Sequence, residues 1–271
     1  MIGRVNILGI GVSAINIPMA VDEIDRWISE NRREYVCVTG MHGVMESQRA
    51  EEIRRVHNAA GLVTPDGMPL VWLLRWFGHR HADRVYGPDL LSAVFERARV
   101  RGYRHFLYGS TPETLRRLEA KLTACFRGAE IAGRISPPFR AVTSAEDGAI
   151  VATINRSGAD IVWVGLSTPR QELWMAEHRA RLAARVLIGV GAAFDYHAGI
   201  VRQAPRFIQR SGFEWLFRLL VEPRRLWRRY LTNIPPFLIK VAMQLLHLRR
   251  YSLDQDASLC AVRGEAGPRL T

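Results

Sequence analysis

Short runs rich in β-branched and aromatic residues alternate with longer amphipathic stretches between residues 1 and 200. The short runs have the length and composition of buried strands, and the longer stretches, several of them opened by proline, have the pattern of helices. Such alternation is typical of βαβ units, so we expect an α/β, Rossmann-like fold with a mainly parallel sheet and helices on both faces. The predicted strands are 5–10, 35–39, 104–108, 130–134, 161–165 and 186–191, and the predicted helices are 18–31, 43–59, 68–77, 88–101, 112–126, 144–157 and 169–182.

The pattern changes after Gly199, where no further strand is indicated. Residues 213–221 predict a helix with one polar stripe, and Pro235-Pro236 is expected to end the helical run before a second helix over 237–248. That second helix has a wide apolar face, which suits either a membrane interface or docking on the body of the protein. We therefore divide the chain into an α/β core (1–200), a helical C-terminal appendage (201–251) and a flexible tail (252–271).

Positive charge is concentrated in the appendage. The chain has a net charge of +12, and residues 202–250 hold eleven basic residues against two acids, a net +9. Nearly all of the basic residues are arginines, which suit bidentate contacts to phosphate. The appendage is therefore expected to meet anions, whether phosphates, nucleic acid or an acidic membrane leaflet.

Composition excludes several classes of protein. With 48% hydrophobic and 24% charged residues the chain is not intrinsically disordered, and three widely spaced cysteines do not make a disulfide scaffold. No apolar run reaches the roughly 18–20 residues of a spanning helix. The polar residues within the first 20 positions argue against a secretory signal peptide. We therefore expect a bacterial cytoplasmic protein.

A glycine pattern near the N-terminus, Gly9-Ile-Gly11-Val-Ser-Ala14, is similar to a dinucleotide-binding fingerprint. That fingerprint requires a helix immediately afterwards, whereas residues 15–17 have the character of a second strand. A tight hairpin is the preferred interpretation, and a dinucleotide-dependent oxidoreductase is the rival that depends on the fingerprint being real.

Polar loops follow several predicted strands, which is where open parallel sheets bind ligands. Asp66 lies in a Pro-Asp-Gly turn, where a carboxylate either shapes the turn or acts as a general base. The loop at Gly109 and the loop over 165–172 both lead from a strand into a helix, whose amide end attracts anions. Together with the helix opened by residues 84–89, these junctions favour a nucleotide or sugar-phosphate ligand.

Histidine and cysteine spacing indicates no metal site: only His79 and His81 are close together, and no third ligand accompanies them. We therefore expect no metal and no cofactor.

Five motifs, in order, resemble those of the WecG/TagA/CpsF family of bacterial glycosyltransferases, over about residues 7–230. Their order makes the match much more specific than any single motif. The motifs are TPDGMPLVW at 64–72, RVYGPD at 84–89, GLSTPRQE at 165–172, GVGAAFD at 189–195, and AP at 204–205 continuing through EW, RL and EPRRLWRRY to residue 230.

This resemblance implies an inverting, metal-independent transfer of a hexosyl residue from a UDP-sugar to a polyprenyl-diphosphate-linked sugar, in exopolysaccharide or cell-envelope polysaccharide synthesis. It implies that residues 1–200 are the catalytic core, that Asp66 is the catalytic base and that the appendage completes the active site at the membrane. The protein is then expected to be peripheral on the inner face of the plasma membrane. The substrate-binding residues carried over from the family's motifs are Thr39, Arg84, Gln171, Arg218, Arg224 and Arg225.

One position departs from the family pattern. The family usually has an asparagine in the loop after Thr39, and this chain has His42 there, so we count His42 among the substrate-binding residues and expect a different donor sugar. The sequence does not decide between a monomer and a homo-oligomer, and nucleic acid is not expected as a partner. A basic scaffold without activity and a nucleic-acid-binding protein remain the alternative functions.

Overall fold

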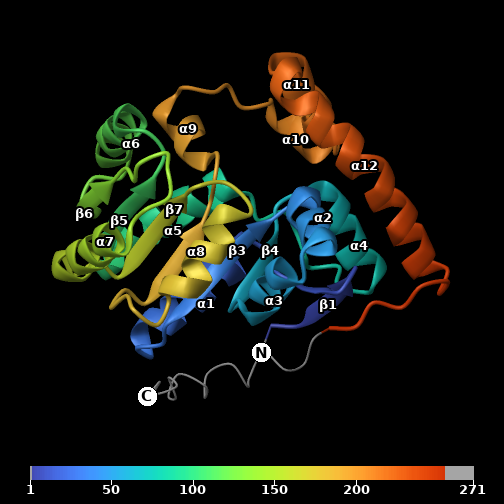
Figure 1. The fold of residues 1–271 in the computed structure, drawn as a ribbon, viewed down its shortest axis with the longest axis horizontal. Helices are drawn as coiled ribbons and strands as arrows, with labels where there is room; N and C mark the ends of the chain where they lie inside the picture. The colour runs from blue at the N-terminus through green and yellow to red at the C-terminus, as the bar shows by residue number, and fades with distance from the viewer. Residues whose placement is uncertain (1, 254–271) are drawn as a thin grey trace, which may run out of the picture.

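The core of the fold is one parallel β-sheet. A computed structural model of the chain describes residues 2–253, without the side chain of Arg225, and within them six strands pair in the order β4-β3-β8-β7-β5-β6 (Figure 1). Every neighbouring pair is parallel. The strands are β3 (Glu34–Thr39), β4 (Leu62–Pro65), β5 (Arg104–Gly109), β6 (Glu130–Ile135), β7 (Ile161–Gly165) and β8 (Val186–Gly189). The predicted fold class is confirmed.

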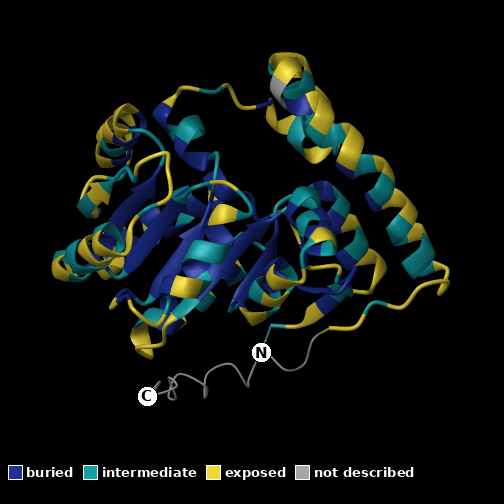
Figure 2. Ribbon diagram, viewed as in Figure 1, coloured by how far each residue is buried: buried dark blue, intermediate teal, exposed yellow. Residues whose placement is uncertain are grey.

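Helices cover both faces of the sheet because strand side chains alternate in direction. Val36 and Val38 point into one core, and Tyr35 and Cys37 point into the other. Figure 2 shows the resulting buried sheet between more exposed helices. The first core is closed by α1 (Ile17–Ser29), α5 (Gly87–Arg101), α6 (Pro112–Cys125) and α9 (Ala193–Ala198), and the second by α2 (Met41–Arg49), α3 (Glu51–Ala59), α4 (Met68–Trp76), α7 (Ser144–Ser157) and α8 (Arg170–His178).

The N-terminal glycine pattern forms a hairpin of β1 (Arg4–Ile7) and β2 (Ile10–Ser13), which are antiparallel. Leu8 and Gly9 make the two-residue turn, with φ of 52° and 82°, the left-handed conformation that such turns require. The single strand predicted over 5–10 and the strand predicted over 15–17 were both wrong. Asn16 instead caps α1, and no helix follows the glycines directly, so the dinucleotide fingerprint is excluded.

The helix predicted over 43–59 is two helices. Ala50 separates α2 from α3 with an extended backbone, φ −134° and ψ 120°. Glu51 and Glu52 then occupy the first turn of α3, where negative charge stabilises a new helix N-terminus.

The appendage contains α10 (Arg206–Arg210), α11 (Glu214–Val221) and a long α12 (Pro223–Leu245). The prediction that Pro235 and Pro236 end a helix was wrong, since both lie inside α12. Pro236 has no N–H for the carbonyl of Thr232, but the guanidinium of Arg49 donates to that oxygen at 3.0 Å. A donor from the core thus compensates for the backbone bond that proline removes.

One face of α12 packs on the core. Phe237 is 2% exposed and joins the core beside the hairpin, while Leu238 and Ile239 remain exposed. Near the end of the helix the amide of Gln244 bonds the backbone of Asn6 and Leu8 at 2.8 and 2.9 Å. The open question about residues 237–248 is therefore answered in part: the helix is docked, and its outer apolar face stays available. Among the described residues no helix is both long and apolar enough to cross a membrane.

Candidate active site

A cavity of about 240 Å³ lies at the carboxyl ends of four adjacent strands, β4, β3, β8 and β7. The loops after these strands line it with Asp66, Gly40, Gly191 and Ser167 respectively. The appendage forms the opposite wall from α11 and α12. This is the position at which open parallel sheets bind their ligands, and here a separate segment covers it.

Asp66 is held by its backbone from two sides. Its N–H donates to the carbonyl of Thr39 at 2.9 Å, and its carbonyl accepts from Arg84 Nε at 2.5 Å. The carboxyl group faces the cavity: about 33% of the side chain is exposed, while Oδ1 is enclosed and has no hydrogen-bond partner among the described residues. Asp66 is therefore fixed in position with a carboxylate able to accept a proton.

Enclosure by the cavity walls raises the pKa of Asp66 to about 6. The charge of Arg84 opposes this rise, and the charge of Glu214 adds to it. At neutral pH the carboxyl is mostly ionised yet takes up a proton more readily than an ordinary aspartate. These are the properties of a general base.

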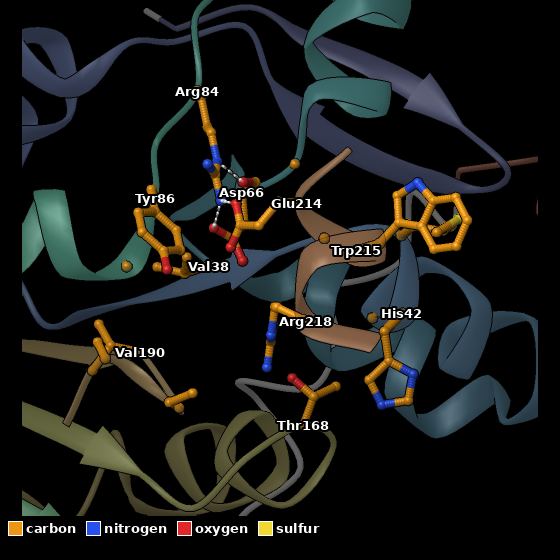
Figure 3. Close-up of a pocket in the computed structure, with 18 of the residues that line it drawn as sticks. Val38, His42, Asp66, Arg84, Tyr86, Thr168, Val190, Glu214, Trp215 and Arg218 are labelled. Carbon is orange, nitrogen blue, oxygen red and sulfur yellow. Dashed lines mark hydrogen bonds and ion pairs between the residues drawn. The ribbon is translucent and has the colours of Figure 1, made fainter. Parts of the chain in front are cut away.

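Arg84 connects the core to the appendage. Its Nη2 lies 2.5 Å from a carboxylate oxygen of Glu214 on α11 and 3.9 Å from Asp66, and Figure 3 shows the guanidinium between the two acids. Its Nη1 donates to Gln209 at 3.3 Å, and its guanidinium carbon stacks 3.9 Å from the ring centre of Tyr86. With these contacts Arg84 is a fixed part of the wall.

Arg218 lies one helical turn beyond Glu214 and points into the same cavity (Figure 3). Its guanidinium lies 6.0 Å from the ring centre of Tyr196, and its Nε is enclosed without a hydrogen-bond partner in the described chain. Burial lowers the pKa of Arg218, but the nearby Tyr196, Tyr230 and Glu214 together raise it by more than burial lowers it. The pKa is therefore raised overall, and the group stays charged. A fixed cation of this kind suits an anionic ligand.

His42 and Gln171 line another part of the cavity. Burial, with the charges of Arg229 and Arg49, lowers the pKa of His42 to about 3, so its imidazole is neutral at physiological pH. Gln171 donates from Nε2 to Glu172 at 3.0 Å, and its Oε1 is enclosed and unpartnered among the described residues. Neutral donors and acceptors of this kind are suited to sugar hydroxyls.

Three predicted site residues lie elsewhere. The Thr39 side chain is buried below the cavity and donates to the carbonyl of Cys37 at 3.2 Å. Gly109 ends β5, which lies beyond β7 in the sheet; there its φ of 121° and close approach to Gly165 require a glycine. Arg224 is exposed on α12 and does not line the cavity. The side chain of Arg225 lies outside the described residues.

Two charged residues of the cavity were missed by the sequence interpretation. Glu214 was noted only as part of a motif, although it is one of just two acids among the eleven basic residues of 202–250, a signal that it pairs with an arginine. Arg229 lines the cavity one turn beyond the arginine pair at 224–225. Arg229 also belongs to the EPRRLWRRY motif, which was the signal that could have found it.

Charge in the cavity comes from arginines and from helix ends. The first residues of α2 and α5 line it, and the amide ends of helices attract anions. No group of three or more His, Cys, Asp or Glu side chains within residues 2–253 is placed to hold a metal ion.

Comparisons with known proteins agree with this geometry. The model of the family described as "Glycosyl transferase WecG/TagA/CpsF family" matches residues 5–251. A curated relative, N-acetylglucosaminyldiphosphoundecaprenol N-acetyl-beta-D-mannosaminyltransferase of Bacillus spizizenii (strain ATCC 23059 / NRRL B-14472 / W23), is 28% identical over 215 residues. The aligned part covers 79% of this chain and 81% of the relative.

Proposed function

Because the chain belongs to the WecG/TagA/CpsF family of glycosyl transferases, we propose that it moves a hexosyl residue from a UDP-sugar to a sugar linked to a polyprenyl diphosphate. The observation that carries the proposal is Asp66, a fixed carboxyl with a pKa raised to about 6, facing a cavity walled by Arg218. A general base beside an anion site is what glycosyl transfer from a nucleotide sugar requires.

The reaction is a single displacement with inversion at the anomeric carbon. An acceptor hydroxyl attacks that carbon while Asp66 takes the hydroxyl proton. The new glycosidic bond forms as the bond to the UDP oxygen breaks, and UDP leaves with the electron pair of that bond. Proton transfer to a positioned base contributes roughly 10²–10⁴-fold to such a step.

Negative charge grows on the diphosphate as UDP departs, and arginines are placed to meet it. Arg218 and Arg229 line the cavity from the appendage, and the first residues of α5 line it from the core. Fixed positive groups aimed at developing charge lower the barrier without reorganisation. The proposed mechanism therefore assigns leaving-group stabilisation to arginines rather than to a divalent metal.

The decisive test is UDP release by the purified protein in EDTA, with a panel of UDP-sugars and short-chain polyprenyl-diphosphate-sugar acceptors. Acceptor-dependent release from one donor, lowered at least about 100-fold by Asp66→Asn with UDP binding retained, is the expected result. Asp22→Asn, on the exposed side of α1, is the matched control. Full turnover by Asp66→Asn would rule out the general-base role. If every donor released UDP at the same rate with and without an acceptor, transfer to the acceptor would be ruled out.

The relative suggests the first substrates to try. Its name gives N-acetylglucosaminyl-diphospho-undecaprenol as acceptor and N-acetylmannosamine as the transferred sugar. We propose an acceptor of that class here and a product that enters exopolysaccharide or another cell-envelope polysaccharide. The donor sugar is to be identified with the panel of UDP-sugars, because His42 lines the cavity where the family usually carries asparagine.

We also propose that the protein works peripherally on the inner face of the plasma membrane, where a polyprenyl-linked acceptor is reached. Leu238 and Ile239 of α12 are exposed on the face opposite the docked Phe237, and Arg249 and Arg250 follow the helix. An apolar face flanked by arginines fits an anionic membrane surface.

Vesicle sedimentation tests this placement. Leu238→Gln with Ile239→Gln should reduce binding to vesicles that contain anionic lipid. Val100→Gln with Phe139→Gln is the control, because these two side chains are 85% and 83% exposed on the core. Equal loss of binding in both double variants, or none in the first, would contradict the assignment of this face.

A further inference from the structure

A second cavity, of about 370 Å³, adjoins the catalytic one. Met68, Arg84 and Gln209 line both cavities, so they form the wall between them. The residues that line only the second cavity are Arg75, Asp83, Asp89, Arg206 and Arg210. Arginines therefore outnumber acids around it by four to two once Arg84 is included, and the site favours an anion.

The arginines of this second cavity differ in how they are held. Arg75 is fixed by bonds to the carbonyl of Ala82 at 2.9 Å and to Asp83 at 3.3 Å. Arg206 and Arg210 lie four residues apart on α10, so they share one face of that short helix. Neither has an ion-pair partner among residues 2–253, so both guanidinium groups remain available for a ligand.

Gln209 fastens this face of α10 to the catalytic wall. Its Nε2 donates to the carbonyl of Ala204 at 2.7 Å, while its Oε1 accepts from Arg84 at 3.3 Å. Arg84 in turn bonds the backbone of Asp66. A ligand held by α10 would thus sit at a set distance from the proposed base.

Two exposed apolar side chains lie next in sequence to arginines of the second cavity. Trp76 follows Arg75 on α4 and is 75% exposed, and Phe207 follows Arg206 on α10 and is 73% exposed. The molecule thus offers exposed apolar side chains, then the arginines of the second cavity, then Asp66 in the adjoining catalytic cavity. A prenyl chain, a diphosphate and a sugar hydroxyl occur in that same order along a polyprenyl-diphosphate-sugar.

We propose that the second cavity binds the diphosphate of the lipid-linked acceptor through Arg206, Arg210 and Arg75, separately from the donor diphosphate in the catalytic cavity. This inference rests on the proposed function and assigns one part of its second substrate. Charge-assisted bonds from two guanidinium groups to a diphosphate are strong enough to govern acceptor affinity.

The test compares two acceptors in detergent solution: N-acetylglucosamine joined to a short prenyl chain through a diphosphate, and the same sugar on a simple alkyl chain. Arg206→Gln with Arg210→Gln should raise the KM for the diphosphate acceptor roughly ten- to a hundredfold. The KM for the UDP-sugar, and turnover of the alkyl acceptor, should stay within about twofold of wild type. Arg206→Lys with Arg210→Lys should recover much of the affinity, because the charge is kept.

The control removes two exposed arginines that line neither cavity, Arg127→Gln with Arg202→Gln, and should leave both KM values unchanged. An unchanged acceptor KM in the α10 variant, or a rise in the donor KM instead, would overturn the proposal while leaving the glycosyltransferase function in place. Failure of the wild type to use any acceptor would overturn both.

Discussion

Nη2 of Arg84 and the carboxylate of Glu214 lie 2.5 Å apart, and each side chain is only 13% exposed. The pair joins the loop before α5 to the first turn of α11, so it is a direct charged contact between the core and the appendage. Asp66 is 3.9 Å from the same guanidinium nitrogen. The environment of the proposed base therefore depends on a residue 148 positions away in the sequence.

Replacing Glu214 by Gln should shift the pH dependence of the reaction. Since the charge of Glu214 helps to raise the pKa of Asp66, its removal should move the acidic limb of kcat/KM from near pH 6 to a lower pH, by roughly half a unit to one unit. The loss of the buried pair should also cost about 1–3 kcal/mol of stability. Glu177→Gln, which removes an exposed acid on α8, is the control. If the acidic limb of kcat/KM lay at the same pH in wild type, Glu214→Gln and Glu177→Gln, the coupling between Glu214 and Asp66 would be excluded.

Asp66 should make the folded protein less stable as the pH rises. Its pKa is about 6 in the folded state and 3.8 in an ordinary aspartate, so the folded state binds the proton more tightly. Its contribution to stability is complete below about pH 4 and is lost as the pH rises through 6. Asp66→Asn cannot ionise, and should be more stable than wild type by about 1–2 kcal/mol at pH 8, a value reduced because the side chain is partly solvated.

Urea unfolding at pH 4.5 and pH 8 measures this difference. The gain from Asp66→Asn should be clear at pH 8 and small at pH 4.5, and Asp22→Asn reports any general effect of losing an aspartate. A gain of equal size at both pH values would show that ionisation of Asp66 is not its cause.

The contribution of Arg49 to the stability of α12 should depend on the presence of Pro236. Arg49→Met removes the donor to the Thr232 carbonyl and should cost about 1 kcal/mol of stability. In a Pro236→Ala background the new backbone N–H can bond that carbonyl, so the same substitution should cost less. A double-mutant cycle from thermal or urea melts gives the difference, and the contact of Arg49 with Glu46 cancels within it. Equal costs in the two backgrounds would contradict this compensation.

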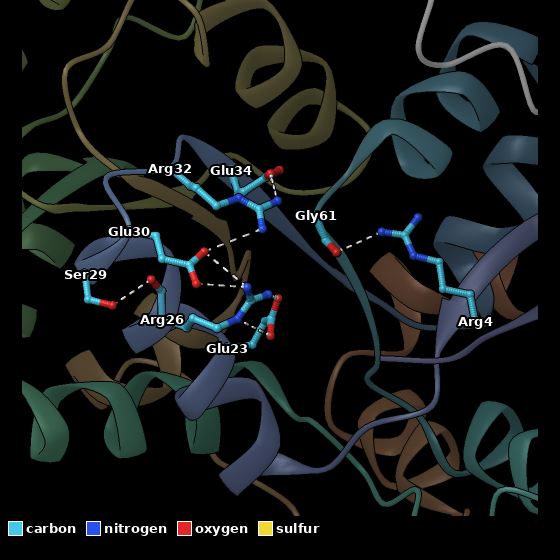
Figure 4. Close-up of polar contacts among 8 residues, drawn as sticks. All are labelled: Arg4, Glu23, Arg26, Ser29, Glu30, Arg32, Glu34 and Gly61. Atoms are coloured by element: carbon cyan, nitrogen blue, oxygen red, sulfur yellow. Dashed lines mark hydrogen bonds and ion pairs between the residues drawn. The ribbon is translucent and has the colours of Figure 1, made fainter. Parts of the chain in front are cut away.

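Arg4 and Arg32 are arginines of very different energetic value (Figure 4). Arg4 is exposed, yet it donates to the carbonyls of Asn58, Ala60 and Gly61 and so ties the hairpin to the start of β4. Arg4→Met removes the donor from all three carbonyls and should cost about 1–2 kcal/mol, because water can replace part of these bonds.

The matched control is Arg32→Met. Arg32 makes only partly exposed ion pairs, with Glu34 at 2.7 Å and Glu30 at 3.9 Å, and such pairs contribute less than about 1 kcal/mol. The urea midpoint of Arg4→Met should therefore fall further than that of Arg32→Met; similar midpoints would show that the bonds of Arg4 add no more stability than exposed ion pairs do.

His42 should influence which donor sugar is used. Its neutral imidazole lines the cavity, and His42→Asn changes both the volume and the hydrogen-bonding groups there. The ratio of kcat/KM between N-acetylmannosamine and glucose donors should change at least about fivefold, with UDP binding unaltered. The control His79→Asn lies outside the cavity and should leave this ratio as in wild type. An unchanged ratio in His42→Asn would show that the imidazole does not contact the sugar.

The sequence alone determined the elements of the core and the loops that carry chemistry. Strand and helix patterns are local, so β7 and α7 were located to the residue from alternation and caps. The ends of parallel strands meet at one edge of a sheet, which drew attention to the loop of Asp66, while Arg84 and Gln171 were chosen from the family's motifs. The concentration of arginine after residue 202 indicated an anion site before any contact was known.

The tertiary structure decided which of these loops share a cavity. Gly109 lies at the end of a strand just as Asp66 does, yet its strand, β5, lies beyond β7, the last of the four adjacent strands whose ends form the site. Strand order depends on long-range packing, which no local pattern records. The proline pair was misread for the same reason, because the donor that permits Pro236 inside α12 is Arg49, from a different element. Glu214 acquires its role only when α11 meets Arg84, since an ion pair exists where folding brings opposite charges together, at any separation in the sequence.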